Sequence, residues 1–215
     1  MTDAEHFFSE PEKLQIAQTI SEVEKSTSGE IRLLVEDRSD AYPEATLLGG
    51  LLIGGIVALA ITDRFFHDSL WAYIPCAFVC FLLAGALLKL LPGLRRLFVF
   101  AHRAERRVRE HGALLFYAHG LHKTREGTGV LFLLSLFEKR VWVLADAGIY
   151  QKLRQEELQT YTSKIVAGIS KGNKTEAICA EIRRLGETLA RHFPPRPDDT
   201  DELANEVIVE GKQPD

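Results

Sequence analysis

The chain carries two uncharged apolar stretches, ATLLGGLLIGGIVALAIT at residues 45–62 and SLWAYIPCAFVCFLLAGALL at residues 69–88. Each is long enough to cross a bilayer core of about 30 Å as a helix. A Leu, Ile, Val or Phe at the centre of such a helix favours insertion by roughly 0.3–0.6 kcal/mol. The two stretches therefore predict a transmembrane helical hairpin within residues 45–92, with its second helix at about 69–91.

Two buried core helices of a soluble protein are the alternative. A chain of 215 residues can hardly enclose two wholly apolar helices on every side, which favours lipid as their surroundings. The connector of residues 63–68 is short, so the helices must be antiparallel neighbours. Gly50 and Gly54 form a GxxxG pattern, whose smooth face suits close contact within the hairpin or self-association between two copies.

The charge distribution predicts how the hairpin is oriented. Basic residues follow the second apolar stretch, whereas the connector of residues 63–68 holds a single arginine, Arg64. By the positive-inside rule, the chain from residue 93 onward is cytoplasmic. Residues 1–40 lack the pattern of a secretory signal and belong on the same side. We therefore expect a multi-pass protein of the cell (inner) membrane of a bacterium, with both termini cytoplasmic.

Six arginines lie between Gly93 and Gly112, against two glutamates. They are Arg95, Arg96, Arg103, Arg106, Arg107 and Arg109. A basic helix next to a membrane gains about 1 kcal/mol per charge from anionic headgroups, so we expect these side chains at the membrane surface. The net charge of −4 and the pI near 6.0 give no reason to expect nucleic acid as a partner.

The remaining sequence predicts a small α/β domain that the hairpin interrupts. Ser9, Pro11 and Glu12 are typical of a helix start, and residues 30–36 have the pattern of a strand. Further strands are expected at residues 130–136 and 140–145, and helices at 94–118, 155–169 and 174–192. Together these elements predict an α/β/α sandwich.

This domain is discontinuous in the predicted organisation. Residues 1–40 form its N-terminal part, and residues 93–193 form the basic juxtamembrane helix and the main part. The hairpin at 45–92 lies between them as an insertion. Residues 194–215 are an acidic, proline-containing tail that we expect to be extended or partly disordered.

Several stretches together resemble the TPM domain, which is named for a thylakoid lumen protein, a photosystem repair protein and an acetylcholine-receptor modulator. They are GEIRLLV from Gly29, TGVLFLLSLFEKRV from Thr128 and ADAGI from Ala145. The tail sequence DELANEVI from Asp201 is similar to that of the bacterial membrane-bound branch. The resemblance therefore implies a TPM-like fold.

The resemblance covers roughly residues 5–37 and 111–210, which is everything except the hairpin. Some plant members of the family are described as acid phosphatases or as helpers in the repair of membrane complexes. Exported relatives carry an acidic Gly-Asp-Tyr-like element late in the domain. Residues 172–174 of this chain read GNK instead, and this departure weakens the case for a metal-dependent activity.

Polar residues flank the predicted central strands. Asp146 follows the second strand, at a position where ligands gather in open α/β sheets, and with Glu126 it would offer oxygen ligands to a divalent cation. The other candidate ligand-binding residues are His122, Thr124, Arg125 and Glu138. The structural alternative is that Asp146 caps a turn beside Gly148 and that Glu138 is a solvated turn residue. No motif identifies a catalytic residue, and none requires a cofactor.

Two hypotheses about function remain from the sequence. The first is a membrane-anchored binding or scaffold module that helps to assemble or maintain a membrane complex, with a membrane protein as partner. The second is a metal-dependent, phosphatase-like hydrolase that uses Asp146 and Glu126.

Overall fold

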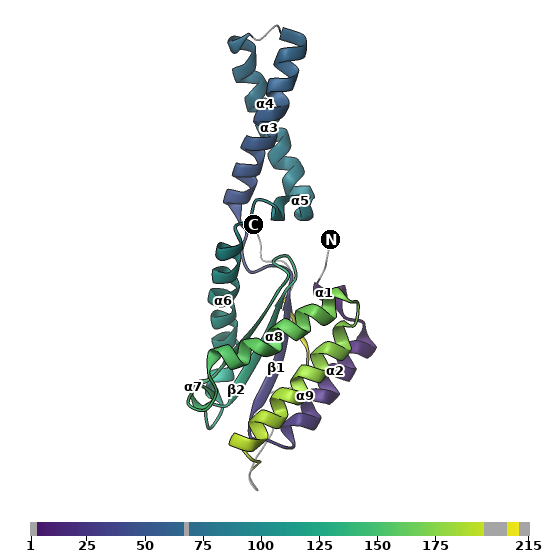
Figure 1. Ribbon diagram of the computed structural model, residues 1–215, viewed down its shortest axis with the longest axis vertical. Coiled ribbons are helices and arrows are strands. Elements are labelled where there is room, and N and C mark those ends of the chain that lie inside the picture. Colours follow the sequence, from purple (N-terminus) through teal and green to yellow (C-terminus); the bar gives the residue numbers. More distant parts are fainter. Residues whose placement is uncertain (1–3, 67–68, 196–205, 211–215) are drawn as a thin grey trace. The chain divides into compact units, whose positions relative to one another are not determined.

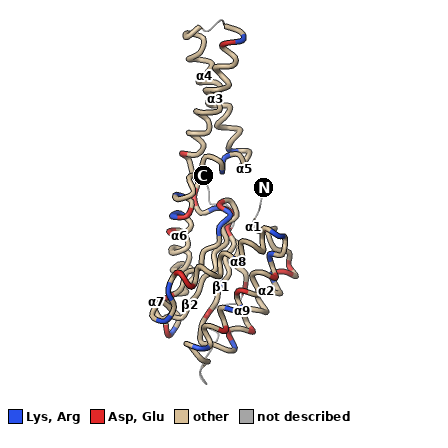
Figure 2. The backbone as a smooth tube through the Cα atoms, viewed as in Figure 1, with Lys and Arg blue, Asp and Glu red and all other residues tan. Residues whose placement is uncertain are grey.

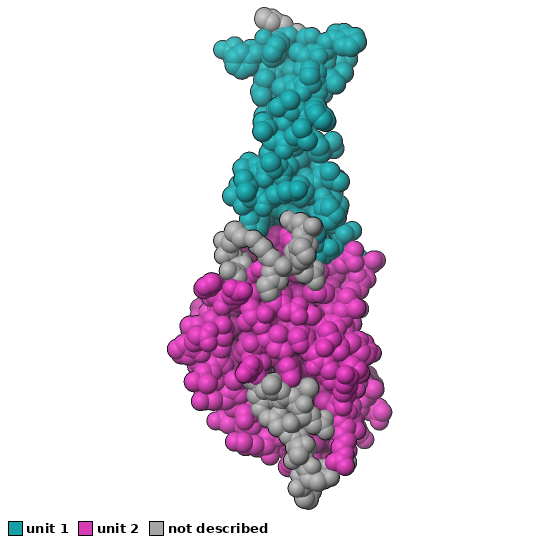
Figure 3. Space-filling view, turned by 180° about the vertical axis from the view of Figure 1, so that it is seen from behind, with its two compact units in different colours: residues 1, 40–104, 215 teal, residues 2–39, 105–214 magenta. Residues whose placement is uncertain are grey.

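The structure is a computed structural model that describes residues 4–66, 69–195 and 206–210. The chain divides into two compact units, which Figure 3 draws in different colours. Residues 40–104 form one unit, which contains the apolar hairpin. Residues 2–39 and 105–214 form the other, an α/β domain assembled from two separate segments. Each unit is described by itself below.

The α/β domain is built on a four-stranded sheet in the order β3-β2-β1-β4. Its strands are β1 (Glu30–Glu36), β2 (Gly129–Ser135), β3 (Arg140–Ala145) and β4 (Ile208–Glu210). β1 runs parallel to both β2 and β4, and β3 is antiparallel to β2. Every residue of β2 is buried, as expected for a central strand covered on both faces.

Helices cover both faces of this sheet (Figure 1). α2 (Glu10–Glu24), α8 (Gln155–Ser170) and α9 (Lys174–His192) pack on one face, and α6 (Ala101–Ala118) packs on the other. The remaining short helices are α1 (Ala4–Phe7), η1 (Leu121–Lys123) and α7 (Ala147–Tyr150). The predicted α/β/α sandwich is therefore confirmed.

The helical faces follow from apolar spacing. On α9, Ile178, Ile182, Leu185 and Leu189 recur at intervals of three or four residues and are fully buried. Val108 and Leu115 of α6 pack against Leu131 and Leu133 of β2 on the opposite face. Because β2 alternates its side chains between the two faces, it joins both apolar clusters into one core.

The hairpin unit consists of α3 (Pro43–Phe66), α4 (Leu70–Leu90) and the short α5 (Pro92–Arg96). α3 and α4 are long and apolar enough to cross a membrane, with mean hydropathy of 2.2 and 2.1. Figure 2 shows that Lys, Arg, Asp and Glu are concentrated near the helix ends. Only 33% of the apolar window of α3 and 6% of that of α4 are buried.

The GxxxG pattern is used inside the hairpin. A Cβ atom on Gly54 would lie 2.6 Å from the backbone nitrogen of Phe81, and one on Gly50 would lie 3.3 Å from the Phe81 ring. Both glycines are buried against α4. Their lack of a side chain lets the two helices approach closely.

Two elements differ from the sequence prediction. The helix expected over residues 94–118 is wrong as a single element, because α5 and α6 are separated at residues 97–100. Tertiary contacts explain the break: Arg95 turns inward to the carbonyl of Tyr42, and Phe98 packs against Gly49. The tail contains a short strand, β4, which pairs with β1. The rest of the acidic tail, residues 196–205 and 211–215, lies outside the described residues.

Candidate functional site

Buried polar residues meet where the parallel strands β1 and β2 end. Glu36 closes β1, Ser135 closes β2, and the two residues are register partners. Ser39 and Glu138 come from the segments that follow these strands. The exposed fractions of the four residues are only 2–6%. We call these residues and His111 the Glu36–Glu138 cluster.

The backbone around this cluster holds its side chains together. The amide of Leu136 donates to the carbonyl of Glu36 at 3.1 Å, and the amide of Phe137 donates to the carbonyl of Asp37 at 2.9 Å. These bonds extend the β1–β2 pairing past the ends of the strands. Lys139, with a φ of 51°, then reverses the chain into β3. Glu138 lies in this turn, and its carboxylate accepts hydrogen bonds from Ser39 and Ser135 at the strand ends.

A continuous set of hydrogen bonds links the two glutamates. The Ser39 hydroxyl donates to Glu36 Oε1 and lies 3.0 Å from the Ser135 hydroxyl, which in turn donates to Glu138 Oε2. The Ser39 amide also donates to Glu138 Oε1 at 3.0 Å. Two carboxylates are therefore held in a nearly water-free space through serine hydroxyls and a backbone amide.

His111 of α6 completes the cluster from the other side. Its Nδ1 lies 2.7 Å from Glu36 Oε2, and its side chain is 12% exposed. The hydrogen bond with Glu36 raises the pKa of His111, although burial opposes this, and the charges of Glu36, Glu210 and Glu138 add to the increase. His119, the residue after α6, and Glu210 of β4 form a second histidine–glutamate pair, with 3.1 Å between Nε2 and Oε1.

The chemistry available to the cluster is that of buried carboxylates and an imidazole. Carboxylate and hydroxyl oxygens are ligands that hard cations accept, and a histidine–glutamate pair can move a proton. Across residues 4–66, 69–195 and 206–210, no group of three or more His, Cys, Asp or Glu side chains is arranged to hold a metal ion. The hydrogen bonds of the cluster join β1, β2 and α6.

The residues proposed as a metal site, Asp146 and Glu126, lie at the opposite end of the central strands. Because β3 is antiparallel to β2, the end of β3 meets the start of β2, and the amide of Asp146 donates to Gly129 O at 2.9 Å. The Asp146 carboxylate accepts from the amide of Ala147 at 2.7 Å and caps α7. Glu126 accepts from the Ser28 hydroxyl at 3.3 Å.

The structure separates Glu138 from the other candidate ligands, because it lies beyond the C-terminal end of β2. Thr124 is buried and shapes the loop before β2: it accepts from the amide of Thr128 at 3.0 Å. His122 is exposed, with its ring 5.0 Å from that of Tyr117. Arg125 is also exposed. The six proposed site residues therefore do not form one constellation.

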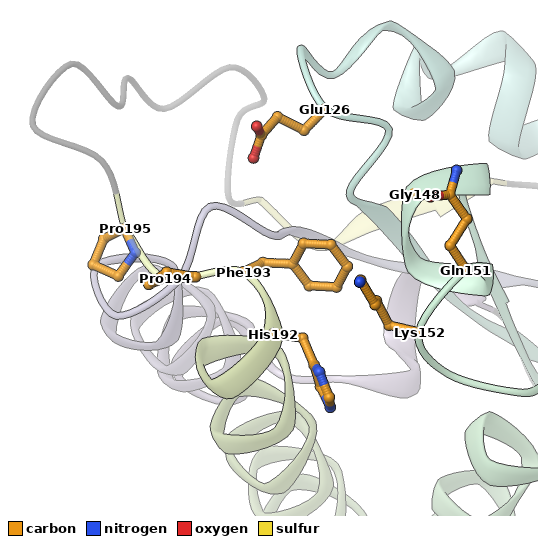
Figure 4. Close-up of a pocket in the computed structure, with 8 residues that line it drawn as sticks. All are labelled: Glu126, Gly148, Gln151, Lys152, His192, Phe193, Pro194 and Pro195. Carbon is orange, nitrogen blue, oxygen red and sulfur yellow. The ribbon is translucent and has the colours of Figure 1, made fainter.

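An open pocket of about 400 Å³ lies beside Glu126 (Figure 4). Its lining residues are Glu126, Gly148, Gln151, Lys152, His192, Phe193, Pro194 and Pro195. Of the residues proposed from the sequence, only Glu126 lines it. The others come from α7 and the loop after it and from the end of α9 and the residues that follow it, far apart in sequence. The local sequence signal for this pocket was Pro194-Pro195, which ends α9 and predicts an irregular segment after it.

The six arginines proposed for the membrane surface have different environments. Arg95 is 9% exposed and donates to the carbonyl of Tyr42 at 3.3 Å. Arg103 pairs with Glu44 at 2.5 Å and with Asp40 at 3.4 Å. The side chains of Arg103, Arg106, Arg107 and Arg109 are each more than one-third exposed. The last three each pair with a glutamate on α6. Arg96 is half-buried at the end of α5.

Comparison with known proteins gives a fold relationship. No protein-family model matches the chain. No curated protein matches it either. Among solved structures, the chain is similar to the NMR structure of the BA42 protein from the psychrophilic bacterium Bizionia argentinensis, with a TM-score of 0.61 and 20% identity. The alignment covers 98% of this chain and 100% of that one. At this identity the similarity concerns the fold.

Proposed function

We propose that this chain is a membrane-anchored protein in which α3 and α4 cross a bilayer and the α/β domain is a cytoplasmic binding module. The observation that carries the proposal is the surface of the hairpin. Large apolar side chains on both helices are exposed, among them Leu47, Leu51, Leu52, Ile56, Leu59, Ile74, Phe78, Leu82, Leu83 and Leu87. Soluble monomers rarely expose apolar patches larger than a few hundred Å². Lipid would cover this surface.

The dimensions of the helices support the same proposal. With a rise of about 1.5 Å per residue, the 24 residues of α3 span about 36 Å and the 21 of α4 about 32 Å. A hydrocarbon core is about 30 Å thick. Trp71, exposed at the start of α4, suits the interfacial region where aromatic rings gather.

The orientation that we propose places the connector outside and the α/β domain in the cytoplasm. It rests on the excess of arginines after α4 over the single Arg64 in the connector of residues 63–68. Arg95 and Arg103 are engaged in contacts within the hairpin unit. Arg96 at the end of α5 and the exposed arginines of α6 are the candidates that we propose for contact with anionic headgroups.

For the α/β domain we propose a TPM-like module that binds a membrane-protein partner. The stretches that resemble the TPM domain cover most of β1, the whole of β2 with the turn into β3, and the start of α7. The pocket beside Glu126 offers a concave surface of mixed character, with Lys152, His192 and the ring of Phe193. Binding pockets commonly combine an apolar wall with a few polar groups.

A labelling experiment tests the membrane proposal. Phe65→Cys places a thiol at the end of α3, within the connector of residues 63–68, and Leu14→Cys places one on α2 of the α/β domain. Both native side chains are exposed. In intact cells without the three native cysteines, a membrane-impermeant maleimide should label only Phe65→Cys. Leu14→Cys should react after permeabilisation. Labelling of Phe65→Cys only after permeabilisation would contradict the orientation, and a monodisperse soluble chain without detergent would contradict the anchor.

A phosphatase-like hydrolase is the second candidate, favoured by the position of Glu126 at the pocket and of Asp146 next to the Glu126 loop. Phosphate release by the purified chain, with and without divalent cations, separates the two candidates. Turnover that is lost in Asp146→Asn and Glu126→Gln, but kept in Glu156→Gln, would replace the binding module by the hydrolase. If these variants instead lose crosslinking to a membrane protein, without any turnover, the binding module is supported.

A further inference from the structure

The segment that follows α4 exposes large apolar side chains outside the two long helices. α4 ends at Leu90, α5 occupies Pro92–Arg96, and residues 97–100 form a turn. Within this segment Leu97 is 77% exposed and Phe100 is 66% exposed. Side chains of this size on a short helix and turn call for a covering surface.

This segment is fixed to the first turns of α3. Arg95 is almost completely buried and donates to the carbonyl of Tyr42, one residue before α3. Phe98 packs against Gly49, where a Cβ atom would lie 2.8 Å from the Phe98 ring and 2.6 Å from Leu88. Phe98 therefore holds the backbone in place, while the neighbouring Leu97 remains exposed.

The anchoring contacts fix the level of the segment along the hairpin. The ion pairs of Arg103 with Glu44 and Asp40 mark the charged start of α3. Gly49, which contacts Phe98, lies five residues after Glu44, or about 8 Å along the helix axis. The headgroup layer on each side of a hydrocarbon core is of similar depth, about 5–8 Å. With Glu44 at the outer edge of a headgroup layer, Phe98 would lie near the boundary between that layer and the hydrocarbon core.

We propose that residues 91–100 form an interfacial lipid-binding element in one leaflet, with Leu97 and Phe100 inserted among the acyl chains and Arg96 against the phosphate of an anionic lipid. This inference rests on the proposed function, because it requires α3 and α4 to span the bilayer. Lipid is the occupant that the observations favour, since Leu90 and Leu91 join this patch directly to the exposed apolar surface of α4.

The charges of the segment point to an anionic lipid. Lys89 and Arg96 flank the apolar side chains, and residues 89–100 contain no Asp or Glu. Arg95 also belongs to the segment, but it is buried against Tyr42 and is not available to a headgroup. Long basic side chains at the end of a membrane helix extend towards the phosphates while their methylene groups remain among apolar neighbours.

Depth-dependent fluorescence quenching tests the element in the full-length chain. Cys76, Cys80 and Cys179 are replaced by alanine, and one environment-sensitive dye is attached at Leu97→Cys, Leu82→Cys or Leu14→Cys. These three native side chains are all more than half exposed. Each protein is reconstituted in vesicles of phosphatidylcholine and phosphatidylglycerol, brominated either near the headgroup or near the chain ends.

Quenching should be stronger from the shallow bromines at position 97 and from the deep bromines at position 82, and absent at position 14. Quenching at 82 without any at 97 would overturn the interfacial element and leave the membrane anchor intact. If neither 82 nor 97 is quenched, the proposed anchor itself fails, and the interfacial element fails with it.

A second measurement tests the preference for anionic lipid. At position 97, brominated phosphatidylglycerol should quench roughly two- to fivefold more than brominated phosphatidylcholine, as basic side chains near a surface favour anionic lipids. In Arg96→Gln this ratio should fall towards one. Arg106→Gln is the control, because Arg106 lies on α6 outside residues 91–100, and it should leave the ratio unchanged. Equal quenching by the two lipids in the unmodified chain would overturn the assignment of an anionic ligand.

Discussion

His111 Nδ1 lies 2.7 Å from Oε2 of Glu36 and joins α6 to the end of the central strand β1. The partner carboxylate is 2% exposed, so the pair has little access to water. A hydrogen bond between charged groups contributes about 1.5–3 kcal/mol. The contact therefore makes a substantial contribution to docking α6 on the sheet.

The first prediction concerns pH. The pKa of His111 is raised above its ordinary value of 6.5, mainly by the hydrogen bond with Glu36. Its stabilising effect is therefore complete below about pH 6.5 and is lost as the pH rises through the elevated pKa of the folded state. The free energy of unfolding, measured in detergent across this range, should fall with rising pH.

The variant His111→Gln keeps a polar side chain but cannot take up the proton. It should be less stable than the unmodified chain by about 1.5–3 kcal/mol at pH 6, and the decline of stability above pH 6.5 should flatten. His122→Gln is the matched control, because this histidine is exposed. A decline of the same slope in His111→Gln would show that another group is responsible.

The second prediction concerns the hydroxyl links of the Glu36–Glu138 cluster. Ser135→Ala removes the hydroxyl that lies between Ser39 and Glu138. The buried Glu138 Oε2 then lacks this donor, which should lower the free energy of unfolding by about 1–3 kcal/mol. The midpoint of chemical denaturation should fall accordingly, whereas Ser163→Ala, which alters an exposed hydroxyl on α8, should change it little. Equal effects of the two substitutions would argue against a stabilising role for the cluster.

The sequence predicts those elements whose signals are local. The strand expected at 140–145 is β3, and the helix expected at 174–192 is α9. β2 begins and ends one residue earlier than the predicted strand at 130–136. In each case the apolar pattern and the flanking turn residues lie within the element itself, and the structure confirms them.

The sequence could not locate features that depend on distant partners. β4 has three residues and exists through pairing with Leu34–Glu36 of β1. The cluster was missed for the same reason: Glu138 was noted, but its link to Glu36 runs through serines nearly a hundred residues apart. The available signal in the sequence was Glu36, an acidic residue at the end of a largely apolar strand.

The third prediction concerns the contact between α3 and α4. A Cβ atom on Gly54 would lie 2.6 Å from the nitrogen and 2.7 Å from the Cα of Phe81, so backbone would have to move. Gly54→Ala should therefore separate the helices and destabilise the hairpin by about 1–3 kcal/mol. Gly55→Ala is the control, because the nearest atom to its Cβ is the Tyr73 hydroxyl at 3.9 Å.

Thermal unfolding in mild detergent measures this difference. The apparent melting temperature of Gly54→Ala should be lower than that of Gly55→Ala, which should equal or slightly exceed that of the unmodified chain. Both substitutions raise helix propensity equally, so the comparison isolates the packing term. If the melting temperatures agree, α3 and α4 do not pack through Gly54 in solution.

The last prediction concerns Glu12, which joins the start of α2 to the start of α9. Burial raises the pKa of Glu12. Hydrogen bonds from the Ser9 amide, the Thr175 and Ser9 hydroxyls and Lys174 outweigh this effect and lower the pKa from 4.5 to about 2. This stabilisation is present above pH 4.5 and is lost as the pH falls towards 2. In Glu12→Gln the stability between these values should depend less on pH. Glu10→Gln, which alters an exposed carboxylate of the same helix turn, should retain the dependence, and an equal loss in both variants would contradict the role of Glu12.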